Sequence, residues 1–184
     1  MAHSQDRRSW LRWATHGLCA IFAAVLGAPA VLYLLDPRNR KAEPSDLRLV
    51  DGVRLDDQRL AGQNPLPVQG VIRAVRVDGW TLHPNDVLGR VWVVKDPEAV
   101  DGFRVFTTIC PHLGCSVNLV EGCFACPCHN ARFQYVGERI NPHANPALRG
   151  MDELEWQRDD IDRERILVRY ENFRPATAEK KVIQ

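Results

Sequence analysis

The stretch CPHLGC at residues 110–115 is followed, after ten residues, by CPCHNA at residues 126–131. Both stretches begin with Cys-Pro and each contains one histidine, although the whole chain has only six cysteines and six histidines. Cys110 and His112 alternate, so both side chains can point the same way from an extended or looped backbone. Thiolate and imidazole donors together suit zinc or an iron–sulfur centre. The two stretches therefore predict a metal site made by two short loops.

The spacing of the donors bears on the kind of metal site. Zinc-finger ligands usually come as a pair of cysteines and a pair of histidines, and Cys110-x-His112 fits neither pair. Cys126 and His129 are three residues apart, which is the spacing of a tight ligand loop. Two cysteines on one iron and two histidines on the other are the ligands of a Rieske [2Fe–2S] centre. A structural zinc site, or two disulfides with surface histidines, are the alternatives.

The two stretches together resemble the signatures of Rieske iron–sulfur proteins, Cys-x-His-x-Gly-Cys in CPHLGC and Cys-x-Cys-His in CPCH. The resemblance implies one [2Fe–2S] cluster as the cofactor. It implies that Cys110 and Cys126 bind one iron and that His112 and His129 bind the other.

The resemblance also implies a disulfide between Cys115 and Cys128 that ties the two loops together. The quinol-oxidising subunits of cytochrome bc-type complexes have this extra cysteine pair, whereas the Rieske proteins of oxygenases and their ferredoxins generally lack it. A disulfide is consistent with export, since the cytosol keeps thiols reduced. Of the remaining cysteines, Cys19 is expected to be a small apolar residue and Cys123 a free or buried thiol.

Residues after the second signature bear on the reduction potential. In high-potential family members the motif continues as Gly-Ser-x-Tyr, and both hydroxyls donate hydrogen bonds towards sulfurs, which raises the potential. This chain has Asn130, Ala131, Arg132 and Phe133 there. Because Ala131 and Phe133 carry no such hydroxyl, we expect a potential lower than in ubiquinol-linked relatives, as suits menaquinol. Leu113 stands where the family has an apolar residue that shields the cluster.

The stretch NPALRGMDELEW at residues 145–156 stands where the family has a proline-rich cover, often near Gly-Pro-x-Pro. Pro146 is retained, while Asn145 and Leu148 replace the expected glycine and second proline. The resemblance therefore implies an altered cover over the cluster.

The N-terminal part of the chain predicts a membrane anchor. Residues 17–35 are 19 residues without a charge, which nearly span a hydrocarbon core. Asp36-Pro37 is expected to end the helix, and Pro29 to kink it. We therefore predict a transmembrane anchor over residues 13–35. A cleaved signal peptide and a buried core helix are the other interpretations.

The segments on either side of the anchor suggest its orientation and its use. DRRSWLR at residues 6–12 resembles the twin-arginine export signal, which carries folded cargo, although Asp6 replaces the usual Ser or Thr. We therefore expect residues 1–12 in the cytoplasm, residues 13–35 in the cell membrane, and the domain at 47–174 on the extracytoplasmic side. A plain positive flank is the alternative. Residues 36–46 are polar, contain two prolines and are expected to form a hinge or linker.

From residue 47 the sequence changes to short alternating runs punctuated by turn residues. It predicts an all-β, Rieske-type antiparallel sandwich over residues 47–174, with a cluster-binding insertion at about 108–150 and a loose polar tail at 175–184. Short turns are expected at 85–89 or 96–101. The predicted strands lie at 71–77, 80–82, 90–95, 103–109, 131–136, 153–159 and 165–170.

The composition fits a folded protein and gives no sign of a nucleic-acid partner. The chain has 184 residues, 45% of them hydrophobic and 26% charged, and a net charge of +1, which is not the basic balance of a nucleic-acid-binding domain.

The resemblance implies a redox subunit of a membrane quinol:cytochrome c oxidoreductase, expected as a dimeric complex. Quinol held by a cytochrome b-type subunit would hydrogen-bond to the imidazole of His129, which takes a proton as an electron is transferred. The head would then move about residues 36–46 to a cytochrome c-type subunit. The alternatives are a membrane-tethered electron carrier, the small subunit of an exported oxidoreductase such as arsenite oxidase, and a non-redox zinc protein.

Overall fold

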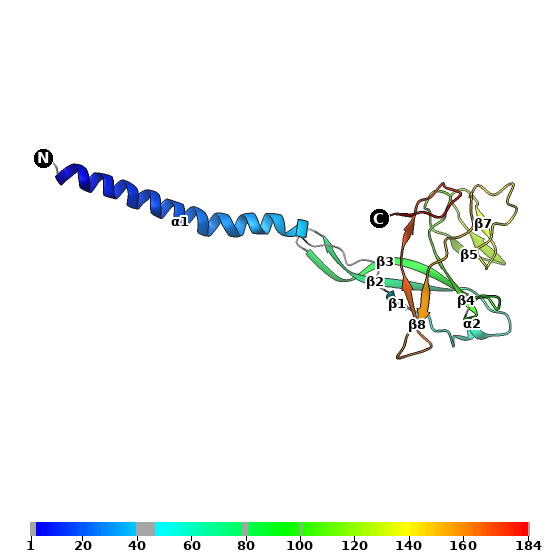
Figure 1. Cartoon of the computed structure of the whole chain (residues 1–184). Coiled ribbons are helices and arrows are strands. Elements are labelled where there is room, and N and C mark those ends of the chain that lie inside the picture. Colours follow the sequence, from blue (N-terminus) through cyan, green and yellow to red (C-terminus); the bar gives the residue numbers. More distant parts are fainter. Residues whose placement is uncertain (1–2, 40–46, 79–80, 100, 184) are drawn as a thin grey trace. The chain divides into compact units, whose positions relative to one another are not determined.

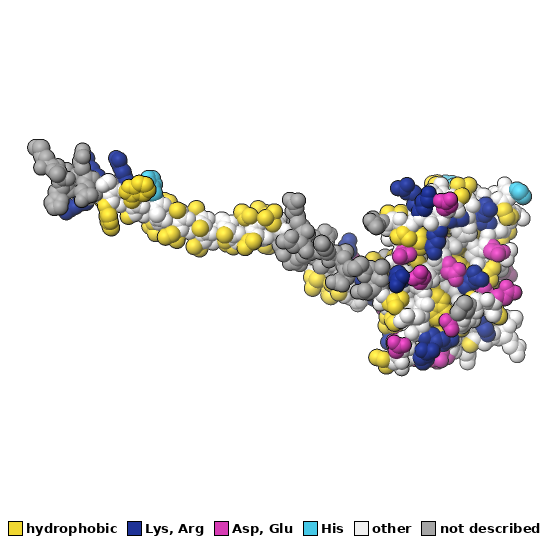
Figure 2. All heavy atoms as spheres, viewed as in Figure 1, with side chains coloured by type: hydrophobic (Ala, Val, Ile, Leu, Met, Phe, Trp, Pro, Cys, Tyr) yellow, Lys and Arg dark blue, Asp and Glu magenta, His cyan; other side chains and the backbone are white. Residues whose placement is uncertain are grey.

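The first element of the computed structural model, which describes residues 3–39, 47–78, 81–99 and 101–183, is one long helix. Helix α1 (His3–Asn39) contains a stretch, Arg7–Leu35, that is long and apolar enough to cross a membrane. At 1.5 Å per residue these 29 residues rise about 43 Å, more than the hydrocarbon core of about 30 Å. Figure 2 shows hydrophobic side chains along this helix, and none of the most apolar window is buried. The expected candidate membrane span is therefore present.

The bounds of the helix differ from those expected. Helix α1 begins well before residue 13, continues across Pro29, and runs through Asp36-Pro37 to Asn39. A proline removes one N–H donor from a helix, and helices in membranes tolerate prolines because the freed backbone groups find other partners, such as side chains, water or neighbouring helices. Of the expected hinge at 36–46, residues 36–39 are helical and residues 40–46 lie outside the described part of the chain.

The described residues from Leu47 to Ile183 are named here the β unit. It is built on a six-stranded antiparallel sheet in the order β4-β3-β2-β1-β9-β8 (Figure 1). The segment that leads into β8 also bonds to β4, because Thr107 N donates to Asp152 O (3.0 Å) and Leu154 N donates to Val105 O (2.8 Å). The sheet is therefore barrel-like, and the expected all-β antiparallel fold is confirmed. Its strands are β1 (Leu47–Asp51), β2 (Val68–Asp78), β3 (Thr81–Lys95), β4 (Phe103–Thr107), β8 (Trp156–Arg158) and β9 (Ile166–Arg169).

Strand β3 contributes side chains to two hydrophobic cores. Val91 and Val93 belong to the core inside the six-stranded sheet, whereas Trp92 and Val94 belong to the core of the insertion that follows β4. Because successive side chains of a strand point to opposite faces, a strand covered on both sides is apolar without alternation. The uninterrupted run VWVV at residues 91–94 is thus explained.

The insertion between β4 and β8 is a small second sheet. Its strands are β5 (Asn118–Val120), β6 (Cys123–Ala125) and β7 (Arg132–Phe133), paired antiparallel in that order. Phe124 and Phe133 are fully buried in its core, and the Phe124 ring lies 5.3 Å from the Trp92 ring, centroid to centroid. In Figure 1, β5 and β7 lie at the end of the β unit away from the short helix α2 (Gln58–Ala61).

Two local features of the β unit differ from the expected ones. Residues 85–89 stay in β3, and the turn is the one that follows β3, at 96–99 and 101, where Asp96 N donates to Gly102 O (3.0 Å). Helix α2 was not expected, because four residues are too few to show a helical period. It is capped by Asp57, whose carboxylate accepts a hydrogen bond from Arg59 N (2.9 Å).

Over residues 175–183, the C-terminal segment differs from the loose tail that we expected at 175–184. Strand β10 (Asn172–Phe173) pairs antiparallel with β11 (Val182–Ile183), so the C-terminal segment folds back on itself. It also receives hydrogen bonds from Arg149 at the carbonyl oxygens of Arg174 and Thr177. A polar composition does not reveal these partners, because they come from residues far apart in the sequence.

Gly137→Ala is expected to destabilise the β unit by about 2–4 kcal/mol. Gly137 has φ +85°, and a Cβ there would lie 2.6 Å from the Phe106 ring, so both the backbone and the ring would have to shift. Gly102→Ala is the matched control, because Gly102 has φ +76° but open space around a Cβ, and we expect about 1 kcal/mol there. Chemical denaturation followed by circular dichroism measures both; equal losses would contradict the packing argument.

Candidate metal centre

The two cysteine-containing stretches form loops of the same construction. In the first, Cys110 N donates to Cys115 O (2.7 Å), and in the second, Cys126 N donates to Ala131 O (2.8 Å). In each loop the first residue therefore bonds to the sixth. The first loop follows β4, and the second connects β6 to β7. The repeated Cys-Pro starts seen in the sequence thus correspond to a repeated backbone geometry.

Two free cysteines lie at the bases of these loops. Cys110 and Cys126 are each only 1% exposed, and neither is in a disulfide. The thiol of Cys126 is near enough to that of Cys110 to affect its pKa. Burial, with a smaller contribution from Cys126, raises the pKa of the Cys110 thiol to about 11. The backbone N–H groups of His112 and Leu113 donate to the same sulfur and oppose this rise. Without a metal, Cys110 is therefore a neutral thiol at pH 7, and binding a metal must release its proton.

The two histidines come together beside this pair. The rings of His112 and His129 are 4.8 Å apart, centroid to centroid, and nearly perpendicular. His129 is exposed, whereas His112 is half-buried. Nδ1 of His112 is buried and has no hydrogen-bond partner among the residues that the structure describes. An orphaned buried nitrogen is costly unless something else binds it.

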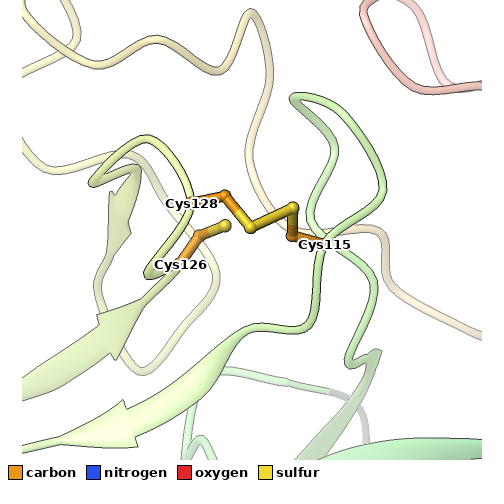
Figure 3. A group of neighbouring side chains, drawn as sticks. All are labelled: Cys115, Cys126 and Cys128. Atoms are coloured by element: carbon orange, nitrogen blue, oxygen red, sulfur yellow. A yellow bond between two sulfur atoms is a disulfide. The ribbon is translucent and has the colours of Figure 1, made fainter.

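A disulfide joins the two loops. Cys115 and Cys128 are bonded, with their Cα atoms 6.6 Å apart, as the resemblance implied. Figure 3 shows the free sulfur of Cys126 beside this bond, and the sulfurs of Cys115, Cys126 and Cys128 all lie within 4.8 Å of one another. These three sulfurs are not a metal site by themselves, because a sulfur in a disulfide has no thiolate to offer.

The residues present fit a [2Fe–2S] cluster with mixed ligands. Two buried thiols provide soft donors, and two adjacent imidazoles, one with an unsatisfied buried nitrogen, provide the others. The other two cysteines stand apart from this set. Cys123 is a free, buried thiol on β6, and Cys19 is exposed on α1.

The second loop explains why this chain departs from the usual motif. Asn130 has φ +55°, a left-handed conformation that asparagine adopts more readily than most residues, so it fits the position where the motif described above has glycine. Ala131 and Phe133 are fully buried and bring no hydroxyl into the core. The two hydroxyl donors that we expected to be missing are thus missing from two fully buried positions. Leu113, expected to shield the centre, has a side chain that is 54% exposed.

Sequence reasoning missed one group of residues next to the first loop. Arg149 and Asp152 form a buried ion pair, and Ala176 N donates to Pro111 O (2.9 Å) in the first loop. The i,i+3 spacing of Arg149 and Asp152 was the only signal in the sequence, and such spacing is common on surfaces.

Comparison with known proteins agrees with this geometry. The family described as the Rieske [2Fe–2S] domain matches residues 68–154. The menaquinol:cytochrome c reductase iron–sulfur subunit of Bacillus subtilis (strain 168) is 26% identical over 163 residues, which cover 86% of this chain and 89% of that protein. The two chains therefore correspond over most of their lengths.

Two solved structures are also similar. The cyanobacterial plasma membrane Rieske protein PetC3 from Synechocystis PCC 6803 is 33% identical, with a TM-score of 0.35, over 48% of this chain and 85% of that chain. The apo form of the quaternary ammonium Rieske monooxygenase CntA is 16% identical, with a TM-score of 0.44, over 75% of this chain and 38% of that chain.

The matched domain contains both loops, the disulfide and the strands from β2 to the segment that closes the sheet. A domain of this family binds a [2Fe–2S] cluster, and the buried thiols and paired imidazoles provide the donors for one. The chain therefore belongs to the Rieske [2Fe–2S] family of electron-transfer proteins.

Proposed function

We propose that the chain is the iron–sulfur subunit of a membrane quinol:cytochrome c oxidoreductase, with menaquinol as the electron donor. The observation that carries the proposal is the exposed ring of His129, 4.8 Å from the His112 ring and next to a buried cysteine pair. A donor set of this kind with one imidazole at the surface can meet a substrate bound in another subunit. The relative from Bacillus subtilis, whose name specifies menaquinol and cytochrome c, supports this choice.

In this proposal Cys110 and Cys126 bind one iron, and His112 and His129 bind the other. The burial of both thiols and the partnerless Nδ1 of His112 support the assignment. Cys115 and Cys128 remain outside the ligand set, because they are consumed in the disulfide. The remaining free thiol of the β unit, Cys123, lies on β6 with its side chain in the core.

The protein groups have separate tasks in the reaction. The bound cluster supplies exchange of one electron at potentials of roughly −150 to +300 mV. His129, through its ring nitrogen that is not bound to iron, accepts a hydrogen bond from a quinol hydroxyl held by a cytochrome b-type subunit, and then accepts the proton. The apolar side chain of Leu113, exposed on the first loop, adds contact area around the exposed imidazole.

The proposal also assigns tasks to the N-terminal part. Helix α1 anchors the chain in the cell membrane, with residues 1–12 in the cytoplasm and the β unit outside, after twin-arginine export of the folded protein. The disulfide supports an oxidising compartment for the β unit. Residues 36–46 act as the hinge by which the head reaches a cytochrome c-type subunit, within a complex that we propose is dimeric.

Two related functions share the same site. A membrane-tethered electron carrier and the small subunit of an oxidoreductase such as arsenite oxidase would need the same donors. Purification from native membranes separates them, because only a quinol:cytochrome c oxidoreductase subunit co-purifies with b-type haem.

His129→Ala is expected to abolish the electron paramagnetic resonance signal of a reduced Rieske centre. The reason is the loss of one of two imidazole ligands. The measurement is a redox titration of native membranes that contain the variant. His143→Ala is the matched control, because His143 is an exposed histidine of the same insertion and its loss should leave the signal unchanged. A normal signal in His129→Ala would show that the ligand assignment is wrong.

Ala131→Ser and Phe133→Tyr are each expected to raise the midpoint potential. A hydroxyl that donates to a sulfur stabilises the reduced, more negative state, and one such bond corresponds to ~60 mV. Val94→Thr, which adds a buried hydroxyl on β3 instead of the second loop, controls for general effects of a buried polar group. The proposal of a low-potential donor such as menaquinol loses its support if both variants leave the midpoint where it was.

A further inference from the structure

We propose that the C-terminal segment at residues 174–183, named here the strap, positions the first cluster loop and thereby raises the reduction potential. The N–H of Ala176 holds the peptide unit between Pro111 and His112, and this keeps the N–H of His112 directed at the Cys110 sulfur. The proposal rests on the assignment of Cys110 as an iron ligand made above. Ala176 acts through the loop, so it is a positioning residue.

The contact lies within the ligand loop itself. Ala176 N donates to Pro111 O at 2.9 Å, and Pro111 is the residue between Cys110 and His112. The N–H of the same peptide unit belongs to His112 and donates to the Cys110 sulfur. The unit is planar and trans, so its C=O and N–H point in opposite directions. A bond that fixes the oxygen therefore fixes the direction of the N–H.

The strap is held in place along its length. Strand β11, at the end of the strap, pairs with β10, which immediately precedes the strap, and Arg174 N donates to Lys181 O (2.8 Å). Lys180 Nζ donates to Glu153 O and lies 4.5 Å from the centre of the Phe173 ring. In Figure 1 the dark-red C-terminal segment lies beside the end of the β unit that carries β5 and β7. The strap is therefore a closed loop against the insertion.

Arg149 anchors the middle of the strap. Its guanidinium donates to Thr177 O (2.6 Å), Thr177 Oγ1 (2.9 Å) and Arg174 O (3.0 Å). It also donates twice to the carboxylate of Asp152, at 2.8 Å each. These bonds use all five donors of an arginine.

The ion pair of Arg149 and Asp152, which holds the strap, is also buried. The side chains of Arg149 and Asp152 are only 9% and 4% exposed. Removing one partner of such a pair leaves a buried charge without compensation. The strap is thus attached through a pair that is costly to break, at the residue next to Ala176.

Ala176 itself adopts an uncommon backbone conformation. Its φ is +56°, in the left-handed region that costs most residues roughly 1 kcal/mol or more. Such a conformation persists where surrounding contacts require it. Here the contacts on either side, at Arg174 and Thr177, turn the N–H of Ala176 towards the cluster loop.

The expected effect on potential follows from two general properties of hydrogen bonds. Donors to cluster sulfurs stabilise the reduced state, because that state is more negative. Hydrogen bonds in a chain polarise one another, so the bond to Pro111 O makes the His112 N–H a stronger donor. Loss of the strap contact should therefore allow the His112 N–H to move more freely and should lower the midpoint potential.

The test compares Ala176→Pro with Ala176→Gly in the full-length holoprotein in detergent. Proline removes the N–H and cannot adopt a positive φ, whereas glycine keeps both. Hydrogen exchange is followed by mass spectrometry, with the amides of β3 and β4 as the internal reference. In the proline variant we expect exchange at His112 and Leu113 to accelerate at least tenfold relative to that reference. We also expect the reduction equilibrium to shift several-fold towards the oxidised state, where tenfold is ~59 mV. The glycine variant should match wild type in both.

Arg149→Lys is a second variant that keeps a charge beside Asp152 but cannot make all five bonds. It should shift both measurements in the same direction as Ala176→Pro, by less. Arg54→Lys is its matched control, because the guanidinium of Arg54 also donates to two carboxylates, those of Asp56 and Asp162, which are not part of the strap, and it should change neither.

Two results would overturn the proposal. One is unchanged relative exchange in Ala176→Pro, and the other is faster exchange with an unchanged midpoint. A missing Rieske signal in the wild type would instead contradict the proposed function, while the exchange data would still report on the strap.

Discussion

The bond between Cys115 and Cys128 is the covalent constraint that holds the two loops of the metal centre together. Each loop is closed by its own hydrogen bond from the first residue to the sixth, but nothing in that closure brings one loop to the other. The disulfide joins the loops covalently and adds to the pairing of β5, which follows the first loop, with β6, which leads into the second. The rings of His112 and His129 lie 4.8 Å apart. The three short strands β5, β6 and β7 add to this constraint through their own core, in which Phe124 and Phe133 are fully buried.

The insertion packs against β3, the strand that contributes side chains both to the core of the insertion and to the core of the larger sheet. Trp92 on β3 packs against Phe124, and its Nε1 donates to Val117 O (3.1 Å). The neighbouring residues Val91 and Val93 point into the other core. The ligand loops are therefore placed on a rigid strand through side chains of alternating direction, which is how functional sites gain precision.

Features that depend on residues close together in the chain could be predicted from the sequence. Features that depend on contacts between distant residues could not. Cys, His and Pro at fixed short spacings indicated both loops, and family resemblance indicated the disulfide, which the structure contains. The closure of the sheet between β4 and residues 152–154, and the bonds from Arg149 to Thr177, join residues far apart in the chain. Neither set of contacts produces a periodic pattern or a motif in the sequence. Helix α1 extends past its expected end at residue 35 to Asn39. The reason here is a different one, because a proline weakens a helix but does not always end it.

The position of Cys126 has a consequence for the order in which the protein matures. Its free sulfur lies within 4.8 Å of both sulfurs of the disulfide, near enough for a thiolate to attack one and release the other. A sulfur that is bound to iron is not available for this exchange. If Cys126 binds iron as proposed, assembly of the metal centre before oxidation protects its sulfur from this exchange. A head that loses its iron in an oxidising compartment is exposed to cysteine scrambling, which would make the loss difficult to reverse.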